Sequence, residues 1–159
     1  LIITATCVNN MNIEYFDHIN TPDIPVITVL LMSISIPIIF KPIKLENKYY
    51  VDGGLISHYP IDFFKDEKDK TLGILVTTSL NKFMEINSIQ DYIYNLMSCP
   101  VTNLLKNCYN NYKDNTILVE NNNINFLDFN LEYNTKISLI EEGYKETIKF
   151  LNINSLNIL

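Results

Sequence analysis

The stretch from Tyr49 to Pro60, YYVDGGLISHYP, restricts the backbone more than any other part of this sequence. Asp52 ends an apolar run, and two of only four glycines, Gly53 and Gly54, follow it directly. Adjacent glycines adopt positive φ without steric cost and allow another group to approach the main chain closely. We therefore expect a strand that ends at Asp52, a sharp turn at the glycines, and a carboxylate free to reach another group.

The first third of the chain predicts a hairpin followed by a short helix. Residues 1–8 are apolar and β-rich, turn residues follow, and residues 13–16 can return as a paired strand. The apolar run that begins at Thr21 and stops at Pro37 predicts a buried helix, with Asp23 as its expected cap.

The second half predicts two further strands between amphipathic helices. Ser88, with Asp91 three residues later, indicates a helix start, and Pro100 is expected to kink or split that helix. TILVE and INFLDF predict short strands, and apolar residues at spacings of three and four over residues 137–151 predict a final helix.

Together these elements favour an α/β fold with a sheet that is covered on both faces. We expect the strands at residues 1–8 and 71–78 to be interior, and residues 138–152 to pack on the sheet as a helix. The acidic and basic run at residues 65–70 is expected to be solvated. The length of 159 residues suits one domain with a substantial core.

Composition argues against some classes of partner and compartment. The formal charge of -6 argues against nucleic acid as a partner, because phosphate binding requires a basic face. Three cysteines without paired or metal-ligand spacing favour a reducing, intracellular compartment, cytoplasmic or peripherally membrane-associated. The uncharged run at residues 24–40 is short for a bilayer span and contains two prolines, so we interpret it as core.

The order of these segments resembles the C-terminal half of a patatin-like phospholipase domain over nearly the whole chain, residues 1–159. The segments that carry the resemblance are TATCVNNMNIEYF, TPDIPVITVLLMSISIPIIFKP, YYVDGGLISHYPID, LGILV and LIEEGYKETIKFL. The resemblance implies the C-terminal portion of a layered α/β/α sandwich. It also implies a serine acyl hydrolase that acts on lipid or phospholipid esters, transiently at a membrane surface and without a cofactor. In such an enzyme Asp52 would form a catalytic Ser-Asp dyad, supported by Gly53 and Gly54.

The chain departs from this family in one respect. Its four glycines are Gly53, Gly54, Gly73 and Gly143, so no G-x-S-x-G motif can be written, and the chain contains no recognisable nucleophile. The family carries this motif and its oxyanion loop upstream. We therefore expect that a missing N-terminal half of the same domain accompanies this chain, and that the chain alone is inactive.

Other interpretations remain open at this point. The chain can be a non-catalytic remnant or interaction module descended from such an enzyme, and Asp52 can simply belong to an Asp-Gly turn. A metal or phosphate site at Asp52 has little support, because no second carboxylate cluster or phosphate-binding loop accompanies it. Ser33 and Ser35 are interpreted as helix-end residues, and His58 as an ordinary hydrogen-bonding residue.

Overall fold

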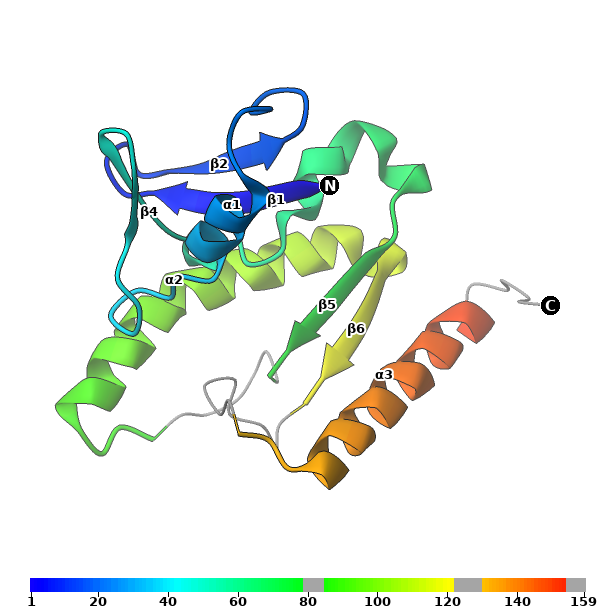
Figure 1. Cartoon of the computed structure of the whole chain (residues 1–159). Helices are drawn as coiled ribbons and strands as arrows, with labels where there is room; N and C mark the ends of the chain where they lie inside the picture. The colour runs from blue at the N-terminus through cyan, green and yellow to red at the C-terminus, as the bar shows by residue number, and fades with distance from the viewer. Residues whose placement is uncertain (79–84, 122–129, 154–159) are drawn as a thin grey trace.

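The computed structural model describes residues 1–78, 85–121 and 130–153. Its N-terminal part is a four-stranded antiparallel sheet with the strand order β2-β1-β4-β3 (Figure 1). The strands are β1 (Ile2–Cys7), β2 (Asn12–Asp17), β3 (Ile43–Leu45) and β4 (Lys48–Asp52). The predicted hairpin and the predicted strand into Asp52 are confirmed.

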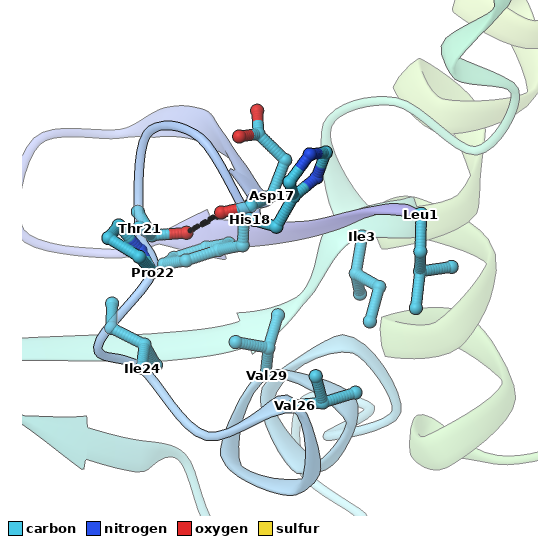
Figure 2. Close-up of a pocket in the computed structure, with 10 residues that line it drawn as sticks. Leu1, Ile3, Asp17, His18, Thr21, Pro22, Ile24, Val26 and Val29 are labelled. Carbon is cyan, nitrogen blue, oxygen red and sulfur yellow. Dashed lines mark hydrogen bonds between the residues drawn. The ribbon is translucent and has the colours of Figure 1, made fainter.

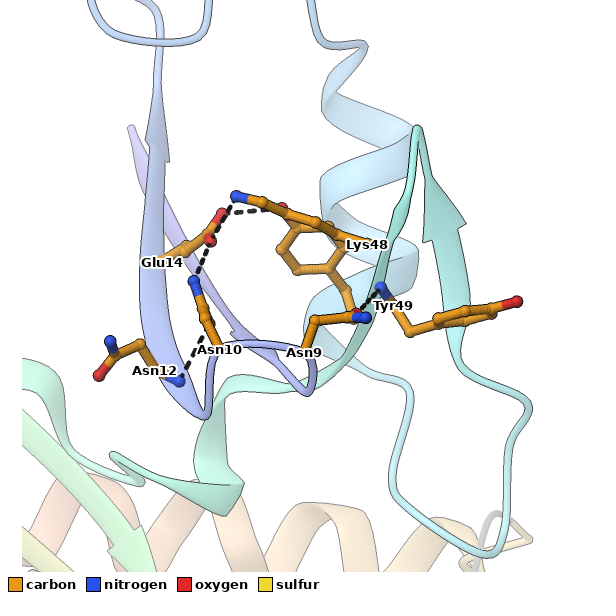
Figure 3. A network of polar contacts seen from close by, with 7 residues as sticks. Asn9, Asn10, Asn12, Glu14, Lys48 and Tyr49 are labelled. Atoms are coloured by element: carbon orange, nitrogen blue, oxygen red, sulfur yellow. Dashed lines mark hydrogen bonds and ion pairs between the residues drawn. The ribbon is translucent and has the colours of Figure 1, made fainter.

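A polar network fixes β4 against the β1–β2 hairpin (Figure 3). One carboxylate oxygen of Glu14 on β2 accepts hydrogen bonds from the Lys48 ammonium at 2.9 Å and from the Asn10 amide at 3.1 Å. The other oxygen accepts the Tyr50 hydroxyl at 2.8 Å. Asn9 adds a bond from the Tyr49 main-chain N–H to its side-chain oxygen at 2.7 Å. The strand that ends at Asp52 is therefore held at its other end by several polar contacts.

The helix α1 (Val26–Ser33) packs on β1 and β4. Its Val29 and Met32 join a buried cluster with Ala5, Cys7, Phe16 and Tyr50. The short helix is thus confirmed, but Asp23 as its cap is wrong. The N-cap residue is Pro25, without a side-chain cap, and its carbonyl accepts the first hydrogen bonds from Thr28 and Val29.

Beyond Asp52 the described residues form a second sheet, which has two strands. The 3-10 segments η1 (Gly53–Leu55) and η2 (Pro60–Lys70) lead into β5 (Gly73–Thr77), which pairs in parallel with β6 (Thr116–Glu120). The helix α2 (Ile89–Tyr112) connects the two strands, and η3 (Lys113–Asn115) follows it. This crossover gives the connection that a parallel pair requires.

The predictions for this part of the chain are confirmed only in part. Ser88 is the N-cap of α2, and its hydroxyl accepts from the Asp91 N–H at 3.1 Å. A split at Pro100 is wrong, because α2 continues through it as one helix. Proline φ suits a helix, and only the missing N–H interrupts the hydrogen-bond ladder. Residues 65–70 are exposed, as predicted.

The prediction that β5 is an interior, fully buried strand is wrong. Burial alternates along β5, and Ile74 is 64 % exposed. Within the described residues β5 pairs with β6 alone, in a sheet separate from that of β1. The continuous apolar sequence of β5 therefore does not correspond to two covered faces.

The final helix α3 (Tyr133–Ile153) lies against β6, so the predicted helix is confirmed (Figure 1). None of its described side chains is buried, so its packing is looser than the predicted one-face contact implies. The predicted strand INFLDF falls on residues 124–129, which lie outside the described residues. Mixed strands and helices confirm the α/β class. Within the described ranges, no helix combines the length and apolar character that crossing a bilayer requires.

Candidate active site around Asp52

Asp52 is the last residue of β4 and lies opposite Ala5 of β1. Its main-chain N–H donates to the Ser35 carbonyl at 2.9 Å, which ties the strand end to the loop after α1. The side chain then caps η1, because Oδ1 accepts the Gly54 N–H at 2.7 Å. The carboxylate is thus positioned by a strand, a loop and a turn.

The second carboxylate oxygen, Oδ2, accepts no hydrogen bond within the described part of the chain. A carboxylate has lone pairs for several donors, so one further hydroxyl can bind there. Burial raises the pKa of Asp52, while the Gly54 N–H and the nearby charge of His58 act in the lowering direction. A carboxylate of raised pKa accepts a proton more readily than an exposed one.

The two glycines act by close approach and not by unusual backbone angles. None of the four glycines has positive φ, so that part of the expectation is wrong. A Cβ at Gly53 would lie 2.8 Å from the Thr4 carbonyl oxygen and 2.6 Å from its Oγ1. At Gly54 a Cβ would lie 3.0 Å from Asp52 Oδ1. The turn is therefore packed directly on β1 and under the carboxylate.

His58, interpreted from the sequence as an ordinary hydrogen-bonding residue, lies close to the Asp52 carboxylate. Its Nδ1 would be 3.1 Å from a Cβ at Gly54, and its charge acts on Asp52. The sequence places it six residues after Asp52, but only the 3-10 turn at Gly53–Leu55 brings the chain back toward the carboxylate. The imidazole is exposed and on the same side of the turn as the Asp52 carboxylate.

The two serines near the site are helix-end residues, as predicted. Ser33 is the last residue of α1. The hydroxyl of Ser35 donates to the Leu31 carbonyl, and the residue is buried. Ser35 therefore touches the site through its main chain, while its hydroxyl is committed to α1.

An open apolar groove lies on the α1 side of the sheet, with a volume of about 340 Å³ (Figure 2). Ile3 and Val29 line it, and the turn after β2 closes it where the Thr21 hydroxyl donates to the Asp17 carbonyl at 2.8 Å. Ile3 shares its face of β1 with Ala5, the residue opposite Asp52. No group of three or more potential metal-ligating side chains is found among the described residues.

The comparison with protein families identifies the part of the chain that contains this site. Residues 1–65 match the patatin-like phospholipase family. The predicted resemblance to this family is thereby confirmed for residues 1–65, from β1 to the first part of η2.

Two viral relatives and one bacterial relative extend the similarity. An uncharacterized protein of Acanthamoeba polyphaga mimivirus is 32% identical over 96% of this chain and 56% of its own length. A probable lipid hydrolase of Invertebrate iridescent virus 6 is 32% identical over 65% of this chain and 37% of its own length. An uncharacterized protein of Bacillus subtilis is 29% identical over 82% of this chain and 48% of its own length. The chain thus spans about half the length, or less, of these relatives.

Proposed function

We propose that this chain supplies the aspartate half of a serine acyl hydrolase that cleaves lipid esters, with Asp52 as the base of a Ser-Asp dyad. The whole chain would then be the C-terminal part of one patatin-like domain. The serine would come from a G-x-S-x-G turn outside these 159 residues, since this chain contains no such motif.

The geometry of the Asp52 carboxylate is the observation that carries the proposal. One oxygen is held by the Gly54 N–H, and the other is open to a hydroxyl. As the serine Oγ attacks the ester carbonyl, Asp52 would accept the hydroxyl proton and return it to the leaving alcohol. Water would then release the acyl group from serine by the same proton exchange. Donors for the oxyanion would come from the part that carries the serine.

The relatives support an ester substrate of lipid type. The matched family is one of phospholipases, and one viral relative bears the name of a probable lipid hydrolase. The apolar groove beside α1 lies on the face of β1 that carries Ala5, the register partner of Asp52. An apolar groove on this face suits a substrate with an apolar part.

The test is turnover of a phospholipid or nitrophenyl ester by a longer protein that contains this chain and a G-x-S-x-G serine. Asp52→Asn should reduce turnover by about two to four orders of magnitude, because the amide cannot take the proton. The variant should unfold at the parent temperature or above it. Because burial raises the pKa of Asp52, its ionised form costs stability as pH rises above the ordinary value of 3.8.

His58→Asn is the matched control, since it changes the neighbouring side chain and leaves the carboxylate in place. It should change turnover little. A stable Asp52→Asn enzyme with near-parental turnover would refute the dyad.

The 159-residue chain alone is expected to be inactive on the same esters, for lack of an attacking group and of oxyanion donors. Turnover that is abolished by Ser33→Ala would contradict this and identify a nucleophile inside the chain.

A further inference from the structure

The loop between α1 and β3 exposes several large apolar side chains. Ile34 and Ile38 to Phe40 are all exposed, and Ile38 is the most exposed of them at 80 %. Leu30 and Leu31 of the adjoining helix α1 are exposed as well. Single exposed apolar residues are ordinary, whereas a contiguous group of this kind marks a contact surface.

Ile38 is held in a strained backbone conformation at the tip of this loop. Its φ is +73°, in the left-handed region that β-branched residues avoid. Asparagine or glycine would be more stable there, because both tolerate positive φ. A β-branched side chain at an exposed, strained position gains nothing from burial in this chain, so the apolar character of Ile38 suggests a role outside it.

The charge around the loop has the opposite sign to that of the whole chain. Residues 24–45 contain Lys41 and Lys44 and no acidic residue, although the chain carries a net charge of -6. Both lysines are exposed, and the Lys44 ammonium lies 5.8 Å from the centre of the Tyr49 ring. An apolar tip followed by lysines complements a bilayer that has an anionic surface and an apolar interior.

The same loop contacts the candidate site through the Ser35 carbonyl, which accepts the Asp52 N–H. We propose that residues 34–42, which we call the docking loop, insert into the surface of an anionic lipid bilayer, with Lys44 of the adjoining strand β3 at the headgroups, and place Asp52 at that surface. The surface around this loop would be the face of the protein that meets the lipid. The inference rests on the proposed function in one respect, namely that docking would bring Asp52 to a lipid ester. Vesicle binding needs no turnover, so the two proposals can fail separately.

The experiment is sedimentation of a longer protein that contains this chain with vesicles of phosphatidylcholine, with and without phosphatidylglycerol. We expect binding to the mixed vesicles and a decrease of about tenfold or more for Ile38→Asn. The same variant should be at least as stable as the parent, since asparagine relieves the strain at positive φ. Lost binding together with retained stability excludes simple unfolding as the cause.

Ile19→Asn is the matched control, because Ile19 is 75 % exposed in the turn after β2 and outside the docking loop. It should bind as the parent does. Equal loss in both variants would overturn the proposal, since binding would then depend on general hydrophobicity.

The dependence of vesicle binding on the two lysines gives a second, independent test. Lys41→Gln and Lys44→Gln should each lower affinity about fivefold on the anionic vesicles and should not affect binding to pure phosphatidylcholine. The matched controls are the single variants Lys65→Gln and Lys70→Gln, at two exposed lysines of η2, and each makes the same change in net charge. Absence of vesicle binding by the parent protein would overturn the proposal. So would a dimer in solution that Ile38→Asn dissociates, because the loop would then be an interface between copies.

Discussion

The two ends of the molecule differ in how completely they bury their apolar residues. In the N-terminal region, residues 1–65, Ala5, Cys7 and Met32 are completely buried between the four-stranded sheet and α1. In the C-terminal region, which begins at residue 66, β5 has one exposed face and α3 has no buried side chain among the residues described. The family match covers the first region, which also contains Asp52. The part with the tighter core is therefore the part that positions the candidate site.

Connectivity explains much of this difference. In the N-terminal region the strands pair antiparallel. Short turns join β1 to β2 and β3 to β4. In the C-terminal region the parallel pair depends on the long crossover through α2. Local pairings cost less chain entropy than distant ones. The comparison predicts that equivalent substitutions have larger effects in the first region than in the second.

The largest expected contrast is between Met32→Ala in α1 and Ile140→Ala in α3. Met32 is fully buried, so its truncation should lower the free energy of unfolding by about 2 to 5 kcal/mol. Ile140 is exposed, and its truncation should change that free energy by at most about 0.5 kcal/mol. Urea denaturation of both variants measures the difference. Similar losses would show that α3 packs as tightly as α1.

A pair of glycine substitutions gives the next contrast. At Gly53 a new Cβ would meet the Thr4 main chain, so Gly53→Ala should cost about 1 to 3 kcal/mol. At Gly143, in α3, a Cβ would meet nothing within 4 Å, so Gly143→Ala should stabilise by about 0.5 to 1 kcal/mol. Melting temperatures should move in opposite directions. A stable Gly53→Ala would mean that the turn does not press on β1.

Glu14 sharpens the comparison through pH. Burial acts to raise the pKa of Glu14, but hydrogen bonds from Lys48, Tyr50 and Asn10 outweigh it, and the net pKa is lowered. The unfolded chain then binds more protons, so this stabilisation is complete above the ordinary value of 4.5 and is lost as pH falls through the folded pKa. Glu14→Gln should cost about 1 kcal/mol at neutral pH. Its difference from the parent should shrink in acid, and a constant difference would contradict the network.

A smaller effect than that of Glu14 is expected at Tyr59, in the buried cluster that joins the end of the first region to the second. Its hydroxyl lies 2.8 Å from Thr116 Oγ1, close to Gly73. Tyr59→Phe should cost about 0.5 to 1 kcal/mol, because Thr116 keeps its bond to the Tyr112 carbonyl. Thermal unfolding followed by circular dichroism measures this. A loss several times larger would indicate that the hydroxyl holds the two regions together.

The sequence predicted the elements with strong local signals. Turn residues between apolar runs located the β1–β2 hairpin, and the Ser88–Asp91 spacing located the start of α2. Asp52 at its strand end was likewise predictable, because an apolar run stops at a polar residue followed by two glycines.

The features that depend on tertiary contacts were not predictable. The apolar composition of β5 does not reveal whether both faces of the strand are covered, and Ile74 lies on the face that is exposed. The reason for Gly53 is contact with Thr4, a residue 49 positions away in the sequence, and not its own φ. The approach of His58 to Asp52 depends on the fold of η1, for which the sequence offers only a general turn signal.

The most direct test of the central claim is the rate at which a fluorophosphonate probe labels serine in a longer protein that contains this chain. The probe reacts with activated serines, so it reports the action of Asp52 without a chosen lipid substrate. We predict labelling at the G-x-S-x-G serine, slowed about a hundredfold or more by Asp52→Asn and little changed by His58→Asn. Labelling of Asp52→Asn at the parental rate, in a variant that unfolds normally, would contradict the account.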